Sequence, residues 1–175
     1  MSRSDLGLVQ VYFGSGKGKT TCALGLGLRA AGHGFRVCMI QFMKGDTKYG
    51  ELRSAKQLDA LSIYQFGRPD LIADPDETDL SEGRRAMEMA AERLSSGDHD
   101  IVILDEVGVA VDMGVVDVED LISALDGRGE NVEVVLTGRT MHPRILEMAD
   151  LVTEMKMVKH PFSTMGMKAR KGIEF

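Results

Sequence analysis

Short apolar runs and helical patterns alternate along the chain and predict a regular succession of strands and helices. The apolar runs lack polar alternation, which is typical of strands that are buried on both faces of a sheet. Between them, apolar residues recur at helical spacing, most clearly at Ala86, Met89, Ala90 and Leu94. We expect strands at residues 8–13, 37–42, 61–66, 101–104 and 132–136 and from 151, and helices at 20–31, 51–60, 79–94, 118–125 and 142–148.

Strands that are separated by helices are the pattern of a parallel sheet whose crossover helices cover both faces. Because such crossovers are right-handed, the predicted fold class is α/β, with a doubly wound, mostly parallel sheet. The 175 residues contain no internal repeat and no Pro/Gly/Ser-rich linker. We therefore expect a single domain over residues 1–175.

Composition narrows the possible partners and the location. The chain carries 21 Lys and Arg against 27 Asp and Glu, a net charge of −6, which argues against a nucleic-acid partner. Residues 1–5 lack the apolar core of a signal peptide, and no apolar stretch approaches the length of a membrane span. These features predict a cytoplasmic protein without a membrane partner, in which Cys22 and Cys38 are reduced core residues.

A glycine-rich segment lies between the first predicted strand and the first predicted helix. Backbone N–H groups of such a turn converge with the positive end of the helix dipole on an anionic phosphate chain. Lys19 can reach a phosphate there, and the Thr20 hydroxyl is placed to ligate Mg²⁺. The predicted nucleotide-binding residues are Gly14, Ser15, Gly16, Lys17, Gly18, Lys19, Thr20 and Thr21.

The spacing of this P-loop departs from the usual G-x-x-x-x-G-K-[ST] motif. Three residues instead of four separate Gly14 from Gly18, and Phe13 takes the usual position of the first glycine. A glycine-rich turn with a solvated lysine is the alternative interpretation. The strand–loop–helix context and the Gly-Lys-Thr-Thr ending favour phosphate binding.

A second half of the site is expected at the end of the strand over residues 101–104. Asp105 and Glu106 follow this apolar run directly, so their carboxylates leave the carboxyl edge of the sheet, where α/β folds bind ligands. Either of them could bind Mg²⁺, directly or through water, and the sequence does not decide between the two. A solvated acidic strand end is the alternative.

Taken together, these motifs resemble the cob(I)alamin (ATP:corrinoid) adenosyltransferase family over most of the chain. The shortened P-loop is similar to the variant of that family, and the order and spacing of the other segments agree with it. Those segments are residues 29–34, 41–45, 104–106, 137–139 with His142, 158–162 and 171–175.

The resemblance implies a RecA-like P-loop NTPase fold, a homodimer, and a reaction in which the 5′-deoxyadenosyl group of ATP passes to cobalt(I) of a corrinoid while triphosphate leaves. Mg²⁺, ATP and a corrinoid are the implied cofactor and substrates, and a reductant protein is a further expected partner. Reduced cobalt is itself the nucleophile, which agrees with the lack of a Ser/His/Asp or Cys/His arrangement. The residues we expect to act on the leaving triphosphate are Lys19 and Arg139.

Other residues keep two interpretations. Lys17 is either a further phosphate contact or a solvated lysine, and Arg139 is either a phosphate clamp or one half of a surface salt bridge. His33 and His142 are expected to be structural or capping residues. Residues 156–175 form a basic tail that we expect to be solvated and partly mobile; by resemblance, it folds over the nucleotide or the corrinoid.

One segment departs from the family pattern. The bacterial members carry an aromatic loop with Phe and Trp, thought to displace the lower cobalt ligand, whereas residues 64–70 read Tyr-Gln-Phe-Gly-Arg-Pro-Asp and the chain has no Trp. The preferred corrinoid and the way in which its lower ligand leaves therefore stay open. The competing functions are a P-loop kinase or NTPase, with Glu106 orienting the acceptor or water, and a nucleotide-gated binding module.

Overall fold

The computed structural model describes residues 3–70 and 73–175, which build a six-stranded parallel sheet. The strand order is β3-β2-β4-β5-β1-β6, and every neighbouring pair runs parallel. The predicted α/β class is confirmed, and the sheet is parallel throughout. Its strands are β1 (Val9–Phe13), β2 (Val37–Phe42), β3 (Leu61–Phe66), β4 (Ile101–Asp105), β5 (Glu133–Gly138) and β6 (Leu151–Glu154).

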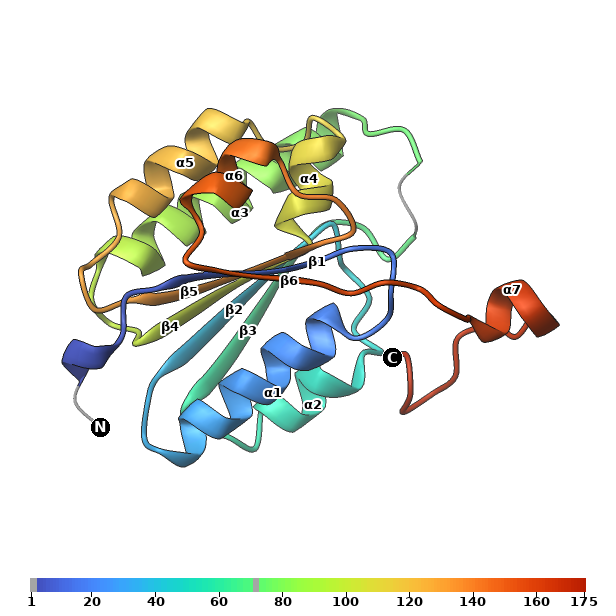
Figure 1. Ribbon diagram of the computed structural model, residues 1–175, viewed down its shortest axis with the longest axis horizontal. Helices are drawn as coiled ribbons and strands as arrows, with labels where there is room; N and C mark the ends of the chain where they lie inside the picture. Colours follow the sequence, from blue (N-terminus) through green and yellow to red (C-terminus); the bar gives the residue numbers. More distant parts are fainter. Residues whose placement is uncertain (1–2, 71–72) are drawn as a thin grey trace.

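Helices cover both faces of this sheet, as the doubly wound prediction required (Figure 1). One face carries α1 (Lys19–Gly32) and α2 (Gly50–Ala55). The opposite face carries α3 (Glu77–Ser95), α4 (Val107–Asp112), α5 (Val118–Asp126) and α6 (Pro143–Met148). A 3₁₀ turn (Arg3–Asp5) precedes β1, and α7 (Pro161–Met165) projects from the body of the domain before the chain returns toward α2.

The central strands are apolar on both sides because both of their faces are packed. In β4, Val102 and Leu104 join the core beneath α3, α5 and α6, whereas Ile101 and Ile103 join the core beneath α1. All four side chains are buried. Burial on both faces explains why these strands show no polar alternation in the sequence.

Three helical segments differ from the prediction. α2 ends at Ala55 instead of residue 60, since the next residues turn tightly toward β3. α4 was not predicted because its valines have a low helix propensity; the helix forms where Val107 and Ala110 pack into the core, so tertiary packing decides. α7 was not predicted either, and it begins with Pro161 after His160 as its N-cap.

The two cysteines lie in different environments. Cys38 is buried in β2 as predicted, but the prediction for Cys22 is wrong, because this residue lies on the exposed side of α1. No described helix is long and apolar enough to cross a membrane. Of the N-terminal segment considered above, residues 1 and 2 lie outside the described part of the chain.

Candidate active site

The glycine-rich segment forms the predicted loop between β1 and α1. α1 begins at Lys19, and Gly18 precedes it with φ 117°. Gly14 has φ 114°, so both residues occupy a left-handed conformation that favours glycine. The loop therefore lies at the N-terminus of a 14-residue helix, where free N–H groups and the helix dipole favour an anion.

A second requirement for glycine comes from the chain that follows β6. A Cβ atom on Gly14 would lie 2.5 Å from the Met155 carbonyl oxygen, and one on Gly16 would lie 2.8 Å from it. The Gly16 N–H donates to that same carbonyl at 2.6 Å. The segment after β6 thus crosses the loop in direct backbone contact, which the sequence alone did not reveal.

Lys19 lies inside the curve of this loop. Its Nζ donates to the carbonyl oxygens of Gly14 at 2.8 Å and Gly16 at 2.7 Å. Partial burial lowers the pKa of Lys19, and the nearby Glu106 carboxylate opposes this shift. An ammonium group in this position can contact a phosphate chain that binds along the loop.

Asp105, at the end of β4, is the centre of a buried polar network. Its Oδ1 accepts hydrogen bonds from the Thr20 hydroxyl at 2.9 Å and the Thr137 hydroxyl at 2.7 Å. Its Oδ2 accepts from Gln41 Nε2 at 3.1 Å and from Lys44 Nζ at 2.6 Å. The fold therefore brings together Thr20 and Asp105, two of the three predicted metal ligands.

The strand order explains the part that Thr137 plays. β5 is the neighbour of β4 in the sheet, so Thr137, near the end of β5, lies beside the residues that end β4. The Thr137 hydroxyl donates to Asp105 and also accepts from the Glu106 N–H at 2.9 Å. The sequence predicted a strand over residues 132–136, but neither its place between β4 and β1 nor the contacts of Thr137.

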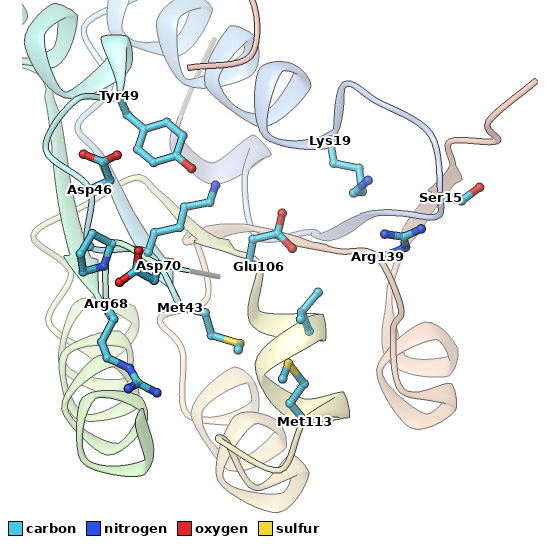
Figure 2. Close-up of a pocket in the computed structure, with 14 residues that line it drawn as sticks. Ser15, Lys19, Met43, Asp46, Tyr49, Arg68, Asp70, Glu106, Met113 and Arg139 are labelled. Atoms are coloured by element: carbon cyan, nitrogen blue, oxygen red, sulfur yellow. The ribbon is translucent and has the colours of Figure 1, made fainter. Parts of the chain in front are cut away.

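Glu106 differs from its neighbour in both contacts and charge. It is half-buried, adopts φ 61°, and begins α4 as its N-cap. Burial raises the pKa of Glu106, the Asp105 charge adds to the increase, and Lys44, Lys19 and Arg139 oppose it. Figure 2 shows the Glu106 carboxylate directed into the same space as Lys19 and Arg139. This third predicted metal ligand therefore lines a cavity instead of joining the Asp105 network.

That cavity has a volume of about 460 Å³. Methionine, valine, proline and tyrosine side chains supply its apolar wall. Lys19, Glu106 and Arg139 lie toward the loop, whereas Asp46, Arg68 and Asp70 lie at the opposite end of the cavity (Figure 2). A pocket of this kind suits a ligand with an organic body and an anionic end. Its lining residues include Ser15, Lys19, Met43, Lys44, Tyr49, Pro69, Glu106, Val109, Met113 and Arg139.

Arg139 follows β5 and is exposed at the rim of the cavity. Within residues 3–70 and 73–175, no carboxylate lies within salt-bridge distance of it, so the surface salt bridge is not formed there. Lys17 is placed differently. It points to the C-terminal tail, where its Nζ pairs with Glu174 at 2.9 Å and donates to the Ile173 carbonyl at 3.3 Å.

Thr20 and Thr21 line a second cavity, of about 380 Å³, which shares Lys44 and Tyr49 with the first. Its far wall includes the last four residues of the chain, 172–175. The tail therefore lies beside the start of α1. Glu174 is bound there by Arg170 and by Lys17, and these two cations lower the pKa of Glu174 to about 2.

Sequence reasoning assigned no role to Gln41, Lys44 or Thr137. Gln41 and Thr137 are polar residues that are fully buried near the ends of otherwise apolar strands, and this is the signal that could have identified them. In the parallel register, Gln41 pairs with Asp105, so the two side chains meet at the carboxyl edge. Burial lowers the pKa of Lys44, but the charge and hydrogen bond of Asp105 outweigh it and raise the pKa overall.

The histidines do not form a metal site. His142 is the N-cap of α6 and its Nδ1 accepts from the Arg144 N–H at 3.3 Å, while His33 is the C-cap of α1. The structural interpretation of these two residues is thus confirmed. In the described part of the chain, no three His, Cys, Asp or Glu side chains are grouped as metal ligands.

The loop after β3, where the chain departs from the family pattern, is held by ion pairs. Arg68 Nε donates to Asp79 at 2.9 Å, and its guanidinium also pairs with Asp76 at 3.1 Å. In Figure 2 the Arg68 side chain points away from Glu106. Phe66 is buried in the core and Tyr64 is exposed, and neither aromatic residue of this segment lines the cavity.

Comparison with known proteins agrees with the resemblance seen in the sequence. A family model described as ATP:corrinoid adenosyltransferase BtuR/CobO/CobP matches residues 5–175. A corrinoid adenosyltransferase of Pseudomonas aeruginosa is 35% identical over 99% of this chain and 86% of its own length. A corrinoid adenosyltransferase of Escherichia coli K12 is also 35% identical, over 99% of this chain and 88% of its own length.

The corrinoid adenosyltransferase CobA of Salmonella typhimurium is 34% identical over 99% of this chain and 88% of its own length. The family model thus matches the chain from the segment before β1 to the end of the tail. The matched range includes every residue of the network around Asp105. Both the family model and these relatives place the chain in the ATP:corrinoid adenosyltransferase family, a family of transferases.

Proposed function

We propose that this protein transfers the 5′-deoxyadenosyl group of ATP to cobalt(I) of a corrinoid and releases triphosphate, in cobalamin biosynthesis or salvage. The observation that carries this proposal is the placement of Lys19 and Arg139 at one cavity that is large enough for part of an organic substrate, while Lys44, which lines the same cavity, joins it to the Thr20–Asp105 pair. Family membership supplies the chemistry of the two substrates.

In the proposed reaction, the cobalt(I) lone pair of the corrinoid attacks C5′ of ATP. A cobalt–carbon bond forms, the C5′–O bond breaks, and its electron pair leaves with the triphosphate. No proton has to be transferred, so the protein needs no general base for this step. Its task is to hold C5′ in line between cobalt and the departing oxygen and to stabilise the charge that develops on the triphosphate.

The residue roles follow from position. The free N–H groups at the start of α1 and the Lys19 ammonium face the phosphate chain. Arg139, which has no carboxylate partner in the described chain, is a second clamp at the cavity rim. Lys17 contributes less, because its ammonium is engaged by the tail at Glu174.

The residues present fit Mg²⁺. The Thr20 hydroxyl and the Asp105 carboxylate lie 2.9 Å apart, and both offer the hard oxygen donors that this ion prefers. Phosphate oxygens and water would complete the coordination, with Glu106 reaching the ion through water. Bound Mg²⁺ would neutralise part of the charge on the triphosphate.

A homodimer, a reductant protein and a cytoplasmic location complete the proposal. All four residues of the edge strand β6 are exposed, and two of them, Leu151 and Val152, are apolar, which supports burial against a second copy. A reductant is required chemically, because the corrinoid must reach cobalt(I) before it can attack.

One observation favours the alternative function of a kinase or NTPase. Glu106 faces the cavity with a raised pKa, and a carboxylate in that position could orient water toward a phosphate. The test is to incubate the protein with ATP, Mg²⁺ and chemically reduced cobalamin and to follow the absorbance spectrum. The spectrum of an alkylcobalamin together with released triphosphate is expected; ADP and orthophosphate without a cobalt–carbon product would favour the alternative.

A further inference from the structure

We propose that Lys44 is a third phosphate-binding cation of this site, which also fixes the Asp105 carboxylate; the inference rests on the proposed function. Lys44 Nζ donates to Asp105 Oδ2 at 2.6 Å, and its side chain is 15% exposed. The lysine therefore ends at the polar network and still reaches the surface of the site.

Lys44 lies where a phosphate chain would pass. It lines the cavity that contains Lys19, Glu106 and Arg139, and it also lines the second cavity beside Thr20 and Thr21. Lys19 lines the first cavity and Thr20 and Thr21 line the second, so both cavities border the start of α1. The Lys44 ammonium lies 5.7 Å from the centre of the Tyr49 ring, a residue shared by both cavities. A phosphate chain bound at the start of α1 would therefore lie in the cavities that Lys44 lines.

The backbone around Lys44 is constrained by more than its ion pair. Met43 and Glu106 are the two non-glycine residues of the described chain with positive φ, at 55° and 61°, and both line the same cavity. A Cβ atom on Gly67 would lie 2.7 Å from the Lys44 backbone nitrogen, so the two loops touch at this point. Strained conformations of this kind gather at functional sites, where the surrounding packing maintains them.

The charges at the site also support a phosphate-binding role for Lys44. A triphosphate brings several negative charges to the site, and the loop side supplies Lys19 while the rim supplies Arg139. Asp105 accepts two hydroxyl and two nitrogen donors, so its carboxylate is satisfied by more than Lys44 alone. The Lys44 ammonium has further donors with which to contact phosphate oxygens while it holds Asp105.

The competing role is purely structural: Lys44 would neutralise buried Asp105 and do nothing else. The two roles differ in what they do to separate parts of the substrate. A phosphate-binding cation strengthens the affinity for inorganic triphosphate and leaves adenosine alone, whereas the loss of a structural ion pair weakens both or neither.

The experiment measures the dissociation constants of Mg²⁺-triphosphate and of adenosine by titration calorimetry in the full chain. Lys44→Met should weaken triphosphate binding roughly ten- to a hundredfold, leave adenosine binding within about twofold, and be largely rescued by Lys44→Arg, which retains the charge. Lys48→Met is the matched control, since Lys48 is an exposed lysine of the same loop that lines neither cavity; its triphosphate affinity should not change.

If Lys44→Met does not fold, Asp105→Asn is compared with Asp105→Asn/Lys44→Met, in which no buried carboxylate lacks its partner. The double variant should bind triphosphate more weakly than the single one. Equal triphosphate affinities, an equal loss for triphosphate and adenosine, or no measurable triphosphate binding by the unmodified protein would overturn the proposal. An unmodified protein that binds triphosphate through Lys44 but forms no cobalt–carbon bond would instead refute the proposed function and leave this inference standing.

Discussion

The carboxyl edge of the sheet and the C-terminal tail both touch the phosphate loop, but they are stabilised in opposite ways. At the sheet edge, Asp105 is fully buried and every contact to it comes from a side chain fixed by a strand, a helix or a packed loop. In the tail, Glu174 forms its ion pairs at the surface. The edge therefore provides rigid geometry, whereas the ion pairs of the tail are screened by salt and add little free energy.

This difference indicates which parts of the site are needed for the reaction and which have only a small effect on its rate. A buried network that loses one member leaves a polar group without a partner, so its disruption is costly. An exposed ion pair exchanges readily with water. Substitutions at the sheet edge and in the loop should consequently reduce the reaction, while substitutions in the tail should change its order and leave the reaction nearly intact.

The largest effect is expected for Lys19→Ala. Its ammonium lies within the loop curve, so its loss should lower kcat/KM for ATP roughly 10²–10³-fold while the fold is retained. Lys17→Ala is the matched control two residues earlier, and it should lose less than about threefold because Lys17 pairs with the tail. Circular dichroism confirms folding. Equal activities of the two variants would refute the distinction between loop and tail.

The next effect concerns metal dependence. Asp105→Asn should raise the Mg²⁺ concentration for half-maximal rate about 10–100-fold, because the amide removes the negative charge beside Thr20. Glu106→Gln should shift the same titration less, since the Glu106 carboxylate lines the cavity and makes no hydrogen bond to Thr20 in the described chain, unlike that of Asp105. If neither substitution changes the Mg²⁺ titration, the ion binds elsewhere.

Two glycines allow the contact between the phosphate loop and the segment after β6 to be tested through protein stability. Gly16→Ala should lower the free energy of unfolding by roughly 1–3 kcal/mol, because the added Cβ would meet the Met155 carbonyl at 2.8 Å. Gly25 is an exposed residue of α1, and a Cβ atom added to it would have nothing within 4 Å. Gly25→Ala should therefore raise the free energy of unfolding by about 0.5–1 kcal/mol. Denaturant unfolding measures both. A neutral Gly16→Ala would show that the segment after β6 gives way without cost.

The smallest effect is expected in the tail. Glu174→Gln should speed hydrogen exchange in residues 170–175 and change kcat/KM less than about threefold. The pKa of Glu174 lies at about 2, below its ordinary 4.5. The stabilisation of the tail by the Glu174 ion pairs is therefore complete above pH 4.5 and is lost as the pH falls toward 2. In the unmodified protein, the protection of the tail amides, after correction for the intrinsic pH dependence of exchange, should fall over that interval, and Glu174→Gln should remove this change in protection. A large loss of activity in Glu174→Gln would place the tail in the catalytic machinery.

The sequence was sufficient to predict the elements that rest on local patterns. Apolar runs and helical spacing gave the strands, the loop and the main helices, since both faces of the sheet are buried. Two kinds of feature depend on three-dimensional arrangement instead. The order of the strands puts β5 between β4 and β1, so Thr137 bridges Asp105 and Glu106. The crossing of the loop by Met155 likewise joins segments more than 130 residues apart in the chain.

Side-chain environment was the other feature that local patterns could not supply. Cys22 follows the Gly-Lys-Thr-Thr motif on a helix that is only partly buried, so its exposure depends on which side of α1 meets the sheet. Lys44 lies in the segment 41–45, which agrees with the family pattern, but nothing local in that segment assigns it a role. Only the packed loops around Met43 and Gly67 bring its ammonium to Asp105.

The proposed function requires that the C5′–O bond of ATP breaks, and one measurement tests this directly. Adenosyl transfer cleaves C5′–O and leaves the phosphate bridges intact, so an ATP analogue with a non-hydrolysable β,γ bridge should still alkylate reduced cobalamin in a single turnover. The released chain, identified by chromatography, should be the intact triphosphate analogue, and ATP itself should yield triphosphate. The proposed function would be contradicted if ATP gave ADP and orthophosphate and neither nucleotide gave a cobalt–carbon product. Such a result would assign the site to phosphate-bond cleavage.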